Sequence, residues 1–294
     1  MASATDRFFL FSYFTNADDG KSGLRLAVSD DGLTYRPINQ GQPLLQPEVG
    51  ASRLMRDPFV LKDTRSDIYH LVWTDSWQGQ TIGYAASPDL VQWSEQRALP
   101  VMATLPGTRN CWAPEIMQDP QSNQFVIFWS STVVEDGSEE TPGTAMRDHR
   151  IYCVTTSDFI SFSEPRLLFD PGFNVIDASF LRTSDGLVLL IKDERSVPEN
   201  KNIRWAPAQS PLGPFGRLSG PITWNWVEGP TSITLGDETI VFFDQYQIGK
   251  YGAVTTRDFA HWSDATHRIS IPQGANHGSI MPLDRATYLR LSTL

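Results

Sequence analysis

The sequence predicts an all-β fold, a five-bladed β-propeller whose ring is closed by N-terminal strands pairing with the C-terminal strand. Three observations predict this fold. A chain of 294 residues is long enough for one such propeller. A short polar signal that ends in an aromatic residue follows an apolar run five times, and helix signals are few. We therefore expect one domain over residues 1–294.

The repeated signal marks one edge of each predicted blade. Each copy follows a strand-length run that is rich in β-branched or aromatic residues. The five copies are Ser29–Tyr35, Ser87–Trp93, Ser157–Phe162, Ser210–Phe215 and Thr256–Trp262. Because the final aromatic residue recurs once per blade, we assign it to the outer strand and expect it to pack within or between blades.

A further strand begins each repeat, at Asp57, Ala113, Asp177, Glu228 and His277. Successive starts lie roughly 50–60 residues apart, which is typical of a propeller blade. We expect blades at residues 55–100, 110–168, 174–220 and 226–270. The fifth blade combines residues 1–40 with residues 275–294, so that the ring has no open edge.

The composition limits the classes of partner. The formal net charge is −10 and the pI is about 4.9, which argues against nucleic acid and anionic membrane surfaces. No apolar run approaches the roughly 20 residues of a membrane span. We expect a monomer that binds a neutral ligand.

The cellular location stays open. We expect a secreted or extracellular protein whose signal peptide is absent from the chain as given, with the cytoplasm as the alternative.

Three of the strand starts carry carboxylates, Asp57, Asp177 and Glu228. The first strand of every propeller blade lines the central channel, so these side chains are predicted to converge on one mouth of that channel. Acids near the axis are costly unless they serve a function. Two carboxylates across a funnel suit cleavage of a glycosidic bond, because one protonates the leaving oxygen while the other deprotonates a water. A third raises the pKa of the general acid by like-charge repulsion.

Four motifs at these positions occur in order and at the blade period, and together they resemble glycoside hydrolase family 43 over essentially the whole chain. The motifs are Arg56-Asp57-Pro58, Trp112-Ala113-Pro114, Val175–Phe180 and Glu228-Gly229-Pro230. The resemblance implies an inverting hydrolase with Asp57 as general base, Glu228 as general acid and Asp177 as the acid that tunes the pKa. It implies most specifically an exo-acting α-L-arabinofuranosidase that removes terminal pentose units from arabinose- or xylose-containing glycans. A β-xylosidase or an arabinanase stays open.

Further residues are candidates for binding the sugar. They are Arg56, Trp73, Trp77, Trp112, Glu115, Asp193 and His277. The tryptophans are placed at channel-side strand ends or in the loops that follow, where they can stack on sugar rings. Glu115 points either to the channel or between blades, and Lys192-Asp193 is placed to reach substrate hydroxyls. Trp224 and Trp226 precede Glu228 and stay unassigned between packing and binding.

His277-Gly278 resembles the channel histidine that often lies near a bound cation or water in family 43. No cluster of Asp, Glu or His at ligand spacing accompanies it, so a structural or water-mediated role is the default. The resemblance implies no required cofactor. It leaves open a structural Ca²⁺ or other cation in the central channel.

Two other functions compete with this interpretation. Retaining β-fructosidases of families 32 and 68 share the propeller and an Arg-Asp-Pro motif, but they need an aspartate nucleophile in an N-terminal motif that Thr15–Gly20 lacks. A non-catalytic propeller that binds glycans is the other alternative, and the intact set of three acids argues against it.

Overall fold

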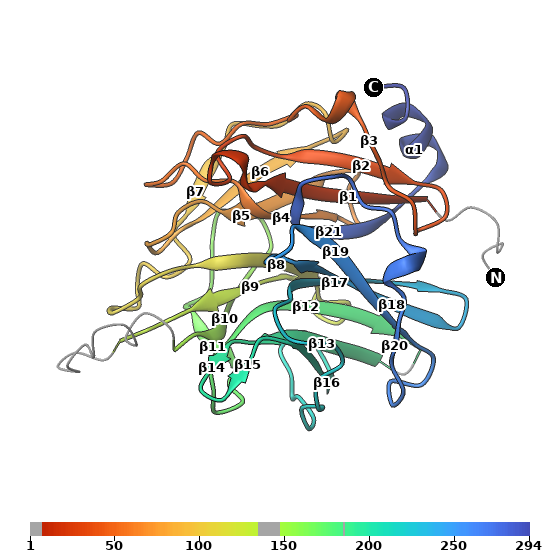
Figure 1. Ribbon diagram of the computed structural model, residues 1–294. Coiled ribbons are helices and arrows are strands. Elements are labelled where there is room, and N and C mark those ends of the chain that lie inside the picture. Colours follow the sequence, from red (N-terminus) through yellow and green to blue (C-terminus); the bar gives the residue numbers. More distant parts are fainter. Residues whose placement is uncertain (1–7, 135–147, 185) are drawn as a thin grey trace.

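The computed structural model describes residues 8–134, 148–184 and 186–294, and the strands in these ranges form five blade sheets around one axis (Figure 1). The inner strands β21, β4, β8, β12 and β17 contact one another in that order, and β17 contacts β21 again. β1 pairs with β21 in antiparallel register, from Phe8 opposite Leu283 to Ser12 opposite Ser279. The predicted five-bladed propeller and its closure are therefore confirmed.

Each sheet runs outward from its inner strand. The first is β21 (Ala275–Leu283), β1 (Phe8–Thr15), β2 (Arg25–Ser29) and β3 (Arg36–Pro37). The second is β4 (Arg56–Lys62), β5 (Tyr69–Thr74), β6 (Ile82–Ser87) and β7 (Arg97–Leu99). The third is β8 (Trp112–Gln118), β9 (Phe125–Ser131), β10 (Arg150–Thr156) and β11 (Arg166–Phe169). The fourth is β12 (Val175–Thr183), β13 (Gly186–Asp193) and β16 (Ile203–Ala208). The fifth is β17 (Glu228–Leu235), β18 (Glu238–Gln245), β19 (Lys250–Thr256) and β20 (Ser263–Asp264).

The remaining elements are short. A hairpin of β14 (Arg195–Ser196) and β15 (Glu199–Asn200) is inserted in the fourth blade, and three 3₁₀ turns lie at Asn16–Asp18, Asn39–Gly41 and Thr266–Arg268. Helix α1 (Arg285–Leu291) follows β21 and contacts β1. Among the described residues no helix is long and apolar enough to cross a membrane.

The repeated polar signal forms a turn before the fourth strand, and its assignment to the outer strand itself was wrong. In Ser87–Gln92 the Ser87 hydroxyl accepts the N–H of Leu90 at 2.8 Å, and the Asp89 carboxylate accepts the N–H groups of the two residues after Leu90. Leu90 adopts a left-handed φ of 66°. The same bonds recur after Thr156 and Thr256. Short polar side chains that satisfy nearby N–H groups thus define the motif.

The fourth blade has three strands where four were expected. Its predicted outer segment contributes only one isolated bridge, between Ala208 and Phe215. Pro211 and Pro214 interrupt this segment, and a proline nitrogen cannot donate to a strand ladder.

Five apolar clusters lie between neighbouring blades and form the core. The aromatic residue at the end of each repeated signal packs in a different cluster, as expected. These residues are Trp93, Tyr35, Phe162, Phe215 and Trp262.

A left-handed residue interrupts the ladder near the start of every inner strand. Its φ is between 22° and 57°, and the strand register shifts at the same point. The residues are Asp57, Ala113, Asp177, Gly229 and His277. Bulges of this kind bend a strand and re-aim a side chain. Here they turn the side chains of three blades, those of Asp57, Asp177 and His277, toward the channel mouth.

Side chains of the preceding blade hold four of these bulges by accepting their backbone N–H groups. The bonds run from Ala113 to Thr74 Oγ1 (2.8 Å), from Asp177 to Ser130 Oγ (3.1 Å), from Gly229 to Asp177 Oδ2 (3.1 Å) and from His277 to Asp244 Oδ2 (3.2 Å). At the fifth bulge the Ser12 hydroxyl donates to the carbonyl oxygen of Pro58 at 2.9 Å. Polar side chains of the second strand in four blades, and Asp177 of the inner strand β12 in the remaining blade, therefore fix the next blade.

Replacing Gly229 with alanine should be more destabilising than the same change at Gly236. Both glycines have positive φ, 57° and 69°, and alanine in this region costs roughly 1–2 kcal/mol. A Cβ at Gly229 would also come within 2.5 Å of the His277 ring, whereas one at Gly236 meets nothing within 4 Å. We expect Gly229→Ala to lower the free energy of unfolding by about 3 kcal/mol in urea titrations. Equal losses for both variants would contradict the close packing of Gly229 on His277.

Candidate active site

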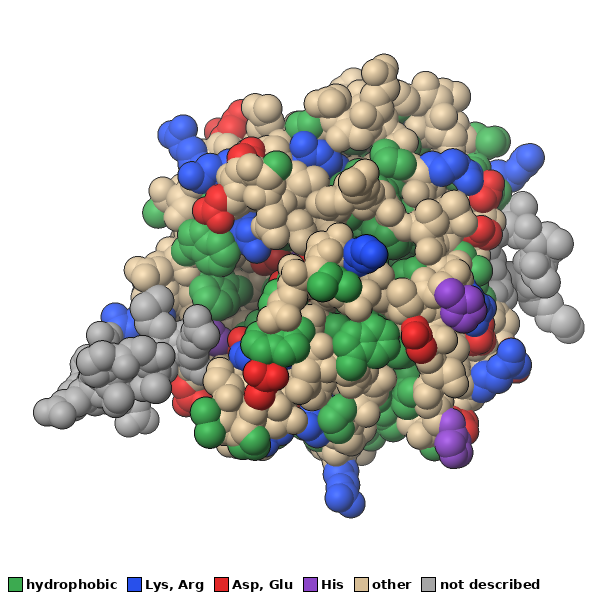
Figure 2. Space-filling view, in the orientation of Figure 1, with side chains coloured by type: hydrophobic (Ala, Val, Ile, Leu, Met, Phe, Trp, Pro, Cys, Tyr) green, Lys and Arg blue, Asp and Glu red, His purple; other side chains and the backbone are tan. Residues whose placement is uncertain are grey.

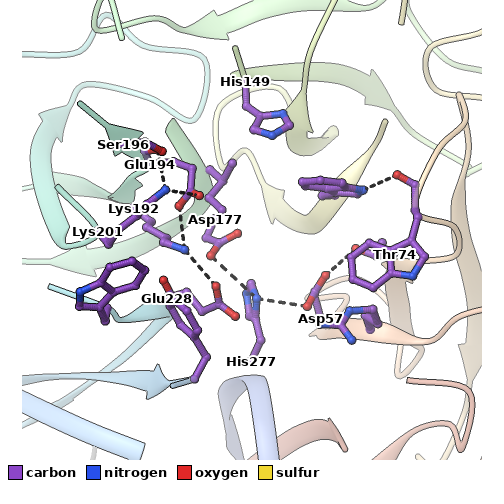
Figure 3. Close-up of a pocket in the computed structure, with 16 residues that line it drawn as sticks. Asp57, Thr74, His149, Asp177, Lys192, Glu194, Ser196, Lys201, Glu228 and His277 are labelled. Atoms are coloured by element: carbon purple, nitrogen blue, oxygen red, sulfur yellow. Dashed lines mark hydrogen bonds and ion pairs between the residues drawn. The ribbon is translucent and has the colours of Figure 1, made fainter. Parts of the chain in front are cut away.

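The mouth of the channel holds a cavity of about 460 Å³, lined by residues of several blades (Figure 3). Three of the lining residues are Asp57, Asp177 and Glu228. His277 lies between the two aspartates, with Nδ1 at 3.2 Å from Asp57 Oδ1 and 4.0 Å from Asp177 Oδ2. The structure thus brings the three predicted catalytic acids together with the predicted channel histidine.

Asp57 is held by two donors. Thr74 donates its hydroxyl hydrogen to Oδ2 at 2.6 Å, and Oδ1 faces the His277 ring. Burial by itself raises the pKa of Asp57, but the charge and hydrogen bond of His277, together with Arg56, outweigh it and leave the pKa below its ordinary value. Asp57 is therefore ionised at neutral pH and can accept a proton.

The pKa of Asp177 is shifted in the opposite direction. Burial raises the pKa of this carboxyl above its ordinary value, although His277 and Lys192 oppose the effect, and the charges of Glu228 and Asp57 add to it. Its Oδ2 accepts the N–H of Gly229, the residue after Glu228. Asp177 thereby fixes the backbone that carries Glu228.

Glu228 begins β17 and contacts a buried ammonium group. Lys192 Nζ lies 3.0 Å from Glu228 Oε2 and 2.8 Å from Glu194 Oε2 (Figure 3). Lys201 pairs with the other oxygen of Glu194. Burial by itself lowers the pKa of Lys192, but Glu228 and Glu194 outweigh it and raise the pKa well above its ordinary value. The two buried lysines and the two partly buried glutamates form a continuous ion network, and Lys192 stays charged.

Aromatic side chains form the rest of the wall. The Arg56 guanidinium lies 4.6 Å from the ring centres of both Phe14 and Trp77, and its Nη1 donates to Asn16. Trp77 meets Trp112 edge-on at 6.0 Å. The predicted sugar-binding residues Arg56, Trp77 and Trp112 therefore all line the cavity, as does His277.

Trp73 and Asp193 do not line the cavity, and their predicted places at the substrate were wrong. Both are fully buried. Trp73 packs over Gly83 in the core, while Asp193 pairs with Arg195 and Arg204. Successive strand residues point to opposite faces. Thr74 and Lys192, the adjacent residues in β5 and β13, face the cavity in their place.

Glu115 also lies outside this cavity. It lines a second cavity of about 1210 Å³ that is bordered by later residues of all five inner strands. Burial raises its pKa to about 8, and a hydrogen bond with Ser179 only partly opposes this. The structure thus places Glu115 on the channel, outside the cavity that the three catalytic candidates line.

Several lining residues were not among the predicted site residues. They are Thr74, His149, Ile176, Glu194, Ser196, Lys201, Trp226 and Tyr246. Thr74 carries a recognisable signal, a polar residue at the end of an apolar second strand. Most of the others follow strands or lie in irregular segments, where strand periodicity gives no orientation.

The surroundings of His277 favour its protonated form, and the structural cation near it stays a prediction. Burial by itself lowers the pKa of His277, but Asp57 and Asp177 outweigh it and raise the pKa to about 10. Within the ranges that the structure describes, no group of three or more His, Cys, Asp or Glu side chains is arranged to hold an ion.

A five-bladed propeller with three carboxylates gathered at its channel mouth is a scaffold of the glycoside hydrolase type. Residues 6–288 match the sequence profile of a family related to glycoside hydrolase family 43 and described as a probable glycosyl hydrolase domain. The chain belongs to this family, and the resemblance predicted from its motifs is confirmed.

Individual relatives are more distant. An α-L-arabinofuranosidase from Bifidobacterium longum subsp. longum is 28% identical over 196 residues, which are 60% of this chain but 18% of that protein. The match therefore spans less than a fifth of that relative. A thermostable family-43 glycoside hydrolase has 19% identity and a TM-score of 0.59 over 76% of this chain and 78% of its own. An endo-arabinase from Bacteroides thetaiotaomicron has 16% identity and a TM-score of 0.59 over 82% and 98%.

The charge of His277 should make its contribution to stability depend on pH. The pKa rises from an ordinary 6.5 to about 10 on folding, so this contribution is complete below about pH 6.5 and is lost as the pH approaches 10. In urea titrations we expect the difference in free energy of unfolding between the wild type and His277→Gln to be largest near pH 6.5. It should shrink steadily up to pH 10. If the difference in free energy of unfolding stays constant from pH 6.5 to pH 10, the His277 ring is not protonated in the folded protein as described.

Proposed function

We propose that this protein hydrolyses glycosidic bonds with inversion, and that its substrate is a terminal α-L-arabinofuranosyl unit of an arabinose- or xylose-containing glycan. The observation that carries the proposal is the convergence of Asp57, Asp177 and Glu228, from three blades, on one cavity. Inverting hydrolysis needs a base and an acid that act on opposite sides of the sugar.

Asp57 is the general base in this mechanism. It is ionised, and donors to both of its oxygens fix the orientation of the carboxylate. A water bound beside it would lose a proton to Asp57 while its oxygen attacks the anomeric carbon. The C–O bond to the leaving group breaks in the same step.

Glu228 is the general acid and delivers a proton to the leaving oxygen. The proton transfer leaves a carboxylate, with which the ammonium of Lys192 interacts most favourably. Glu194 and Lys201 hold that ammonium in place from its other side. Asp177 orients Glu228 through the N–H of Gly229 and adds negative charge nearby.

The identity of the terminal sugar is argued from the similarity to a relative and from the size of the cavity. The partial similarity to an α-L-arabinofuranosidase supports arabinose as the terminal sugar of the substrate. The cavity is at the lower end of the roughly 300–1,000 Å³ typical of ligand pockets, which suits a short glycan segment and exo action. Aryl glycosides of α-L-arabinofuranose and β-D-xylose, together with arabinan, distinguish this activity from those of a β-xylosidase or an arabinanase.

Asp57→Asn and Glu228→Gln should differ in how their activity depends on the leaving group. We expect Asp57→Asn to lose at least about 1000-fold in kcat on every aryl glycoside, because water activation is always needed. Glu228→Gln should lose about as much with a methoxyphenyl leaving group. It should lose less than about tenfold with dinitrophenol, which leaves without a proton. Steady-state kcat values of both variants, measured on a series of aryl glycosides that differ in the phenol released, test these expectations.

Asp237→Asn is the matched control, because this carboxylate is exposed and pairs only with the exposed Arg257 among the described residues. It should leave kcat unchanged. Wild-type activity that survives in both Asp57→Asn and Glu228→Gln would refute the assignment of these roles.

Lys192→Met should weaken catalysis most for poor leaving groups, because it removes the ammonium that stabilises the carboxylate left on Glu228. We expect about a 100-fold loss in kcat with methoxyphenyl glycosides and a much smaller loss with dinitrophenyl glycosides. Thermal unfolding followed by circular dichroism identifies any loss of folded protein, since the change also leaves Glu194 with one fewer partner. Lys250→Met, at an exposed lysine of β19, is the control. A uniform loss across all leaving groups would argue against this role.

A further inference from the structure

We propose that Trp224 and Trp226, here called the tryptophan platform, bind the sugar residues on the leaving-group side of the scissile bond. The ligand is a neutral oligosaccharide that continues beyond the cavity. This inference rests on the proposed function, because it takes Glu228 as the general acid.

The two indole rings are unusually exposed for their size. Trp224 is 40% exposed and Trp226 is 36% exposed, whereas Trp73 and Trp129 are fully buried. Large apolar side chains that gather on a surface mark binding sites more often than single exposed ones do. Hydrophobic side chains also gather over the middle of the face shown in Figure 2.

Both rings are held in place despite their exposure. Trp224 packs edge-on against Phe243 with ring centres 5.2 Å apart, and its indole N–H donates to Gln245 Oε1 at 3.2 Å. Trp226 packs against Tyr246 at 6.3 Å. A rigid aromatic surface loses little conformational freedom when a ligand binds.

The backbone between the rings is also fixed. The side-chain oxygen of Asn225 accepts the N–H of Lys201 at 3.2 Å and an amide hydrogen of Asn202 at 2.8 Å. Trp226 itself has a φ of 70°, which is uncommon and costly for a bulky residue. The surrounding bonds thus hold a strained conformation that keeps Trp226 at the cavity wall.

The platform lies on the side of the general acid. Trp226 lines the cavity, is two residues before Glu228 and contacts Tyr246, another lining residue. Because the general acid protonates the leaving oxygen, the leaving group must lie beside Glu228. Trp224 lies outside the cavity lining, so the pair extends from the cavity wall to the surface.

The chemistry of the platform selects the class of ligand. An aromatic face packs well against the C–H face of a sugar ring. The net charge of −10 disfavours polyanions. A neutral arabino- or xylo-oligosaccharide fits both conditions, and the platform would make the enzyme prefer such chains to simple glycosides.

The test compares leaving groups that share one terminal sugar. We expect the ratio of kcat/KM for a tetrasaccharide to kcat/KM for the aryl glycoside to fall about tenfold in Trp224→Ala. It should be largely restored in Trp224→Phe, which keeps an aromatic face. Leu167→Ala, at an exposed leucine of another blade, is the control and should leave the ratio unchanged. Arabinan- and xylan-derived tetrasaccharides, tested separately, distinguish the two sources.

A binding measurement makes the result independent of turnover. Calorimetric titration of Asp57→Asn protein with the same tetrasaccharides should give a dissociation constant about tenfold higher when Trp224→Ala is added. If neither the ratio nor the dissociation constant changes by more than twofold, the platform is refuted, whereas the proposed function stands as long as the wild type releases sugar. If the wild type releases no sugar but binding still weakens tenfold, the proposed function fails and the platform stands as a glycan-binding site.

Discussion

The interaction on which the site depends is the hydrogen bond that one blade makes to the left-handed bulge of the next. A residue other than glycine in this conformation costs roughly 1–2 kcal/mol, about the net contribution of one or two hydrogen bonds. The bonds from Asp177 to Ser130 and from His277 to Asp244 offset this cost at two functional positions. Because the ring is closed, a shift at one bulge would strain its neighbours. The positions of the acids are therefore fixed by the packing of the whole propeller.

The charges at the cavity are balanced, although the chain as a whole is acidic. Asp57, Asp177, Glu194 and Glu228 face Arg56, Lys192, Lys201 and a protonated His277. The ion pairs of Asp57 with His277 and of Glu194 with Lys192 and Lys201 offset part of the cost of burying these charges. The two carboxylates proposed as base and acid have different partners: Asp57 interacts with His277, and Glu228 interacts with Lys192.

The sequence predicted the ring and the positions of its acids because both repeat once per blade. It could not predict which neighbour of a strand-end pair faces the cavity. A one-residue offset exchanges the two faces of a strand, which is why Trp73 was assigned in place of Thr74 and why Asp193 was named beside Lys192. The bulges of β4 and β12 also break the alternation of the inner strands where the site begins. Residues such as Lys201 and Tyr246 reach the cavity from irregular segments and have no periodic signal.

The central claim is that Asp57 and Glu228 act on opposite sides of the sugar as separate base and acid. The most direct test is proton NMR of the first-formed sugar during hydrolysis of an aryl α-L-arabinofuranoside, recorded before mutarotation. Inversion predicts that the β-anomer of arabinose appears first and the α-anomer grows in later. If the α-anomer appears first, a covalent or double-displacement mechanism operates and the roles assigned to the two carboxylates are wrong.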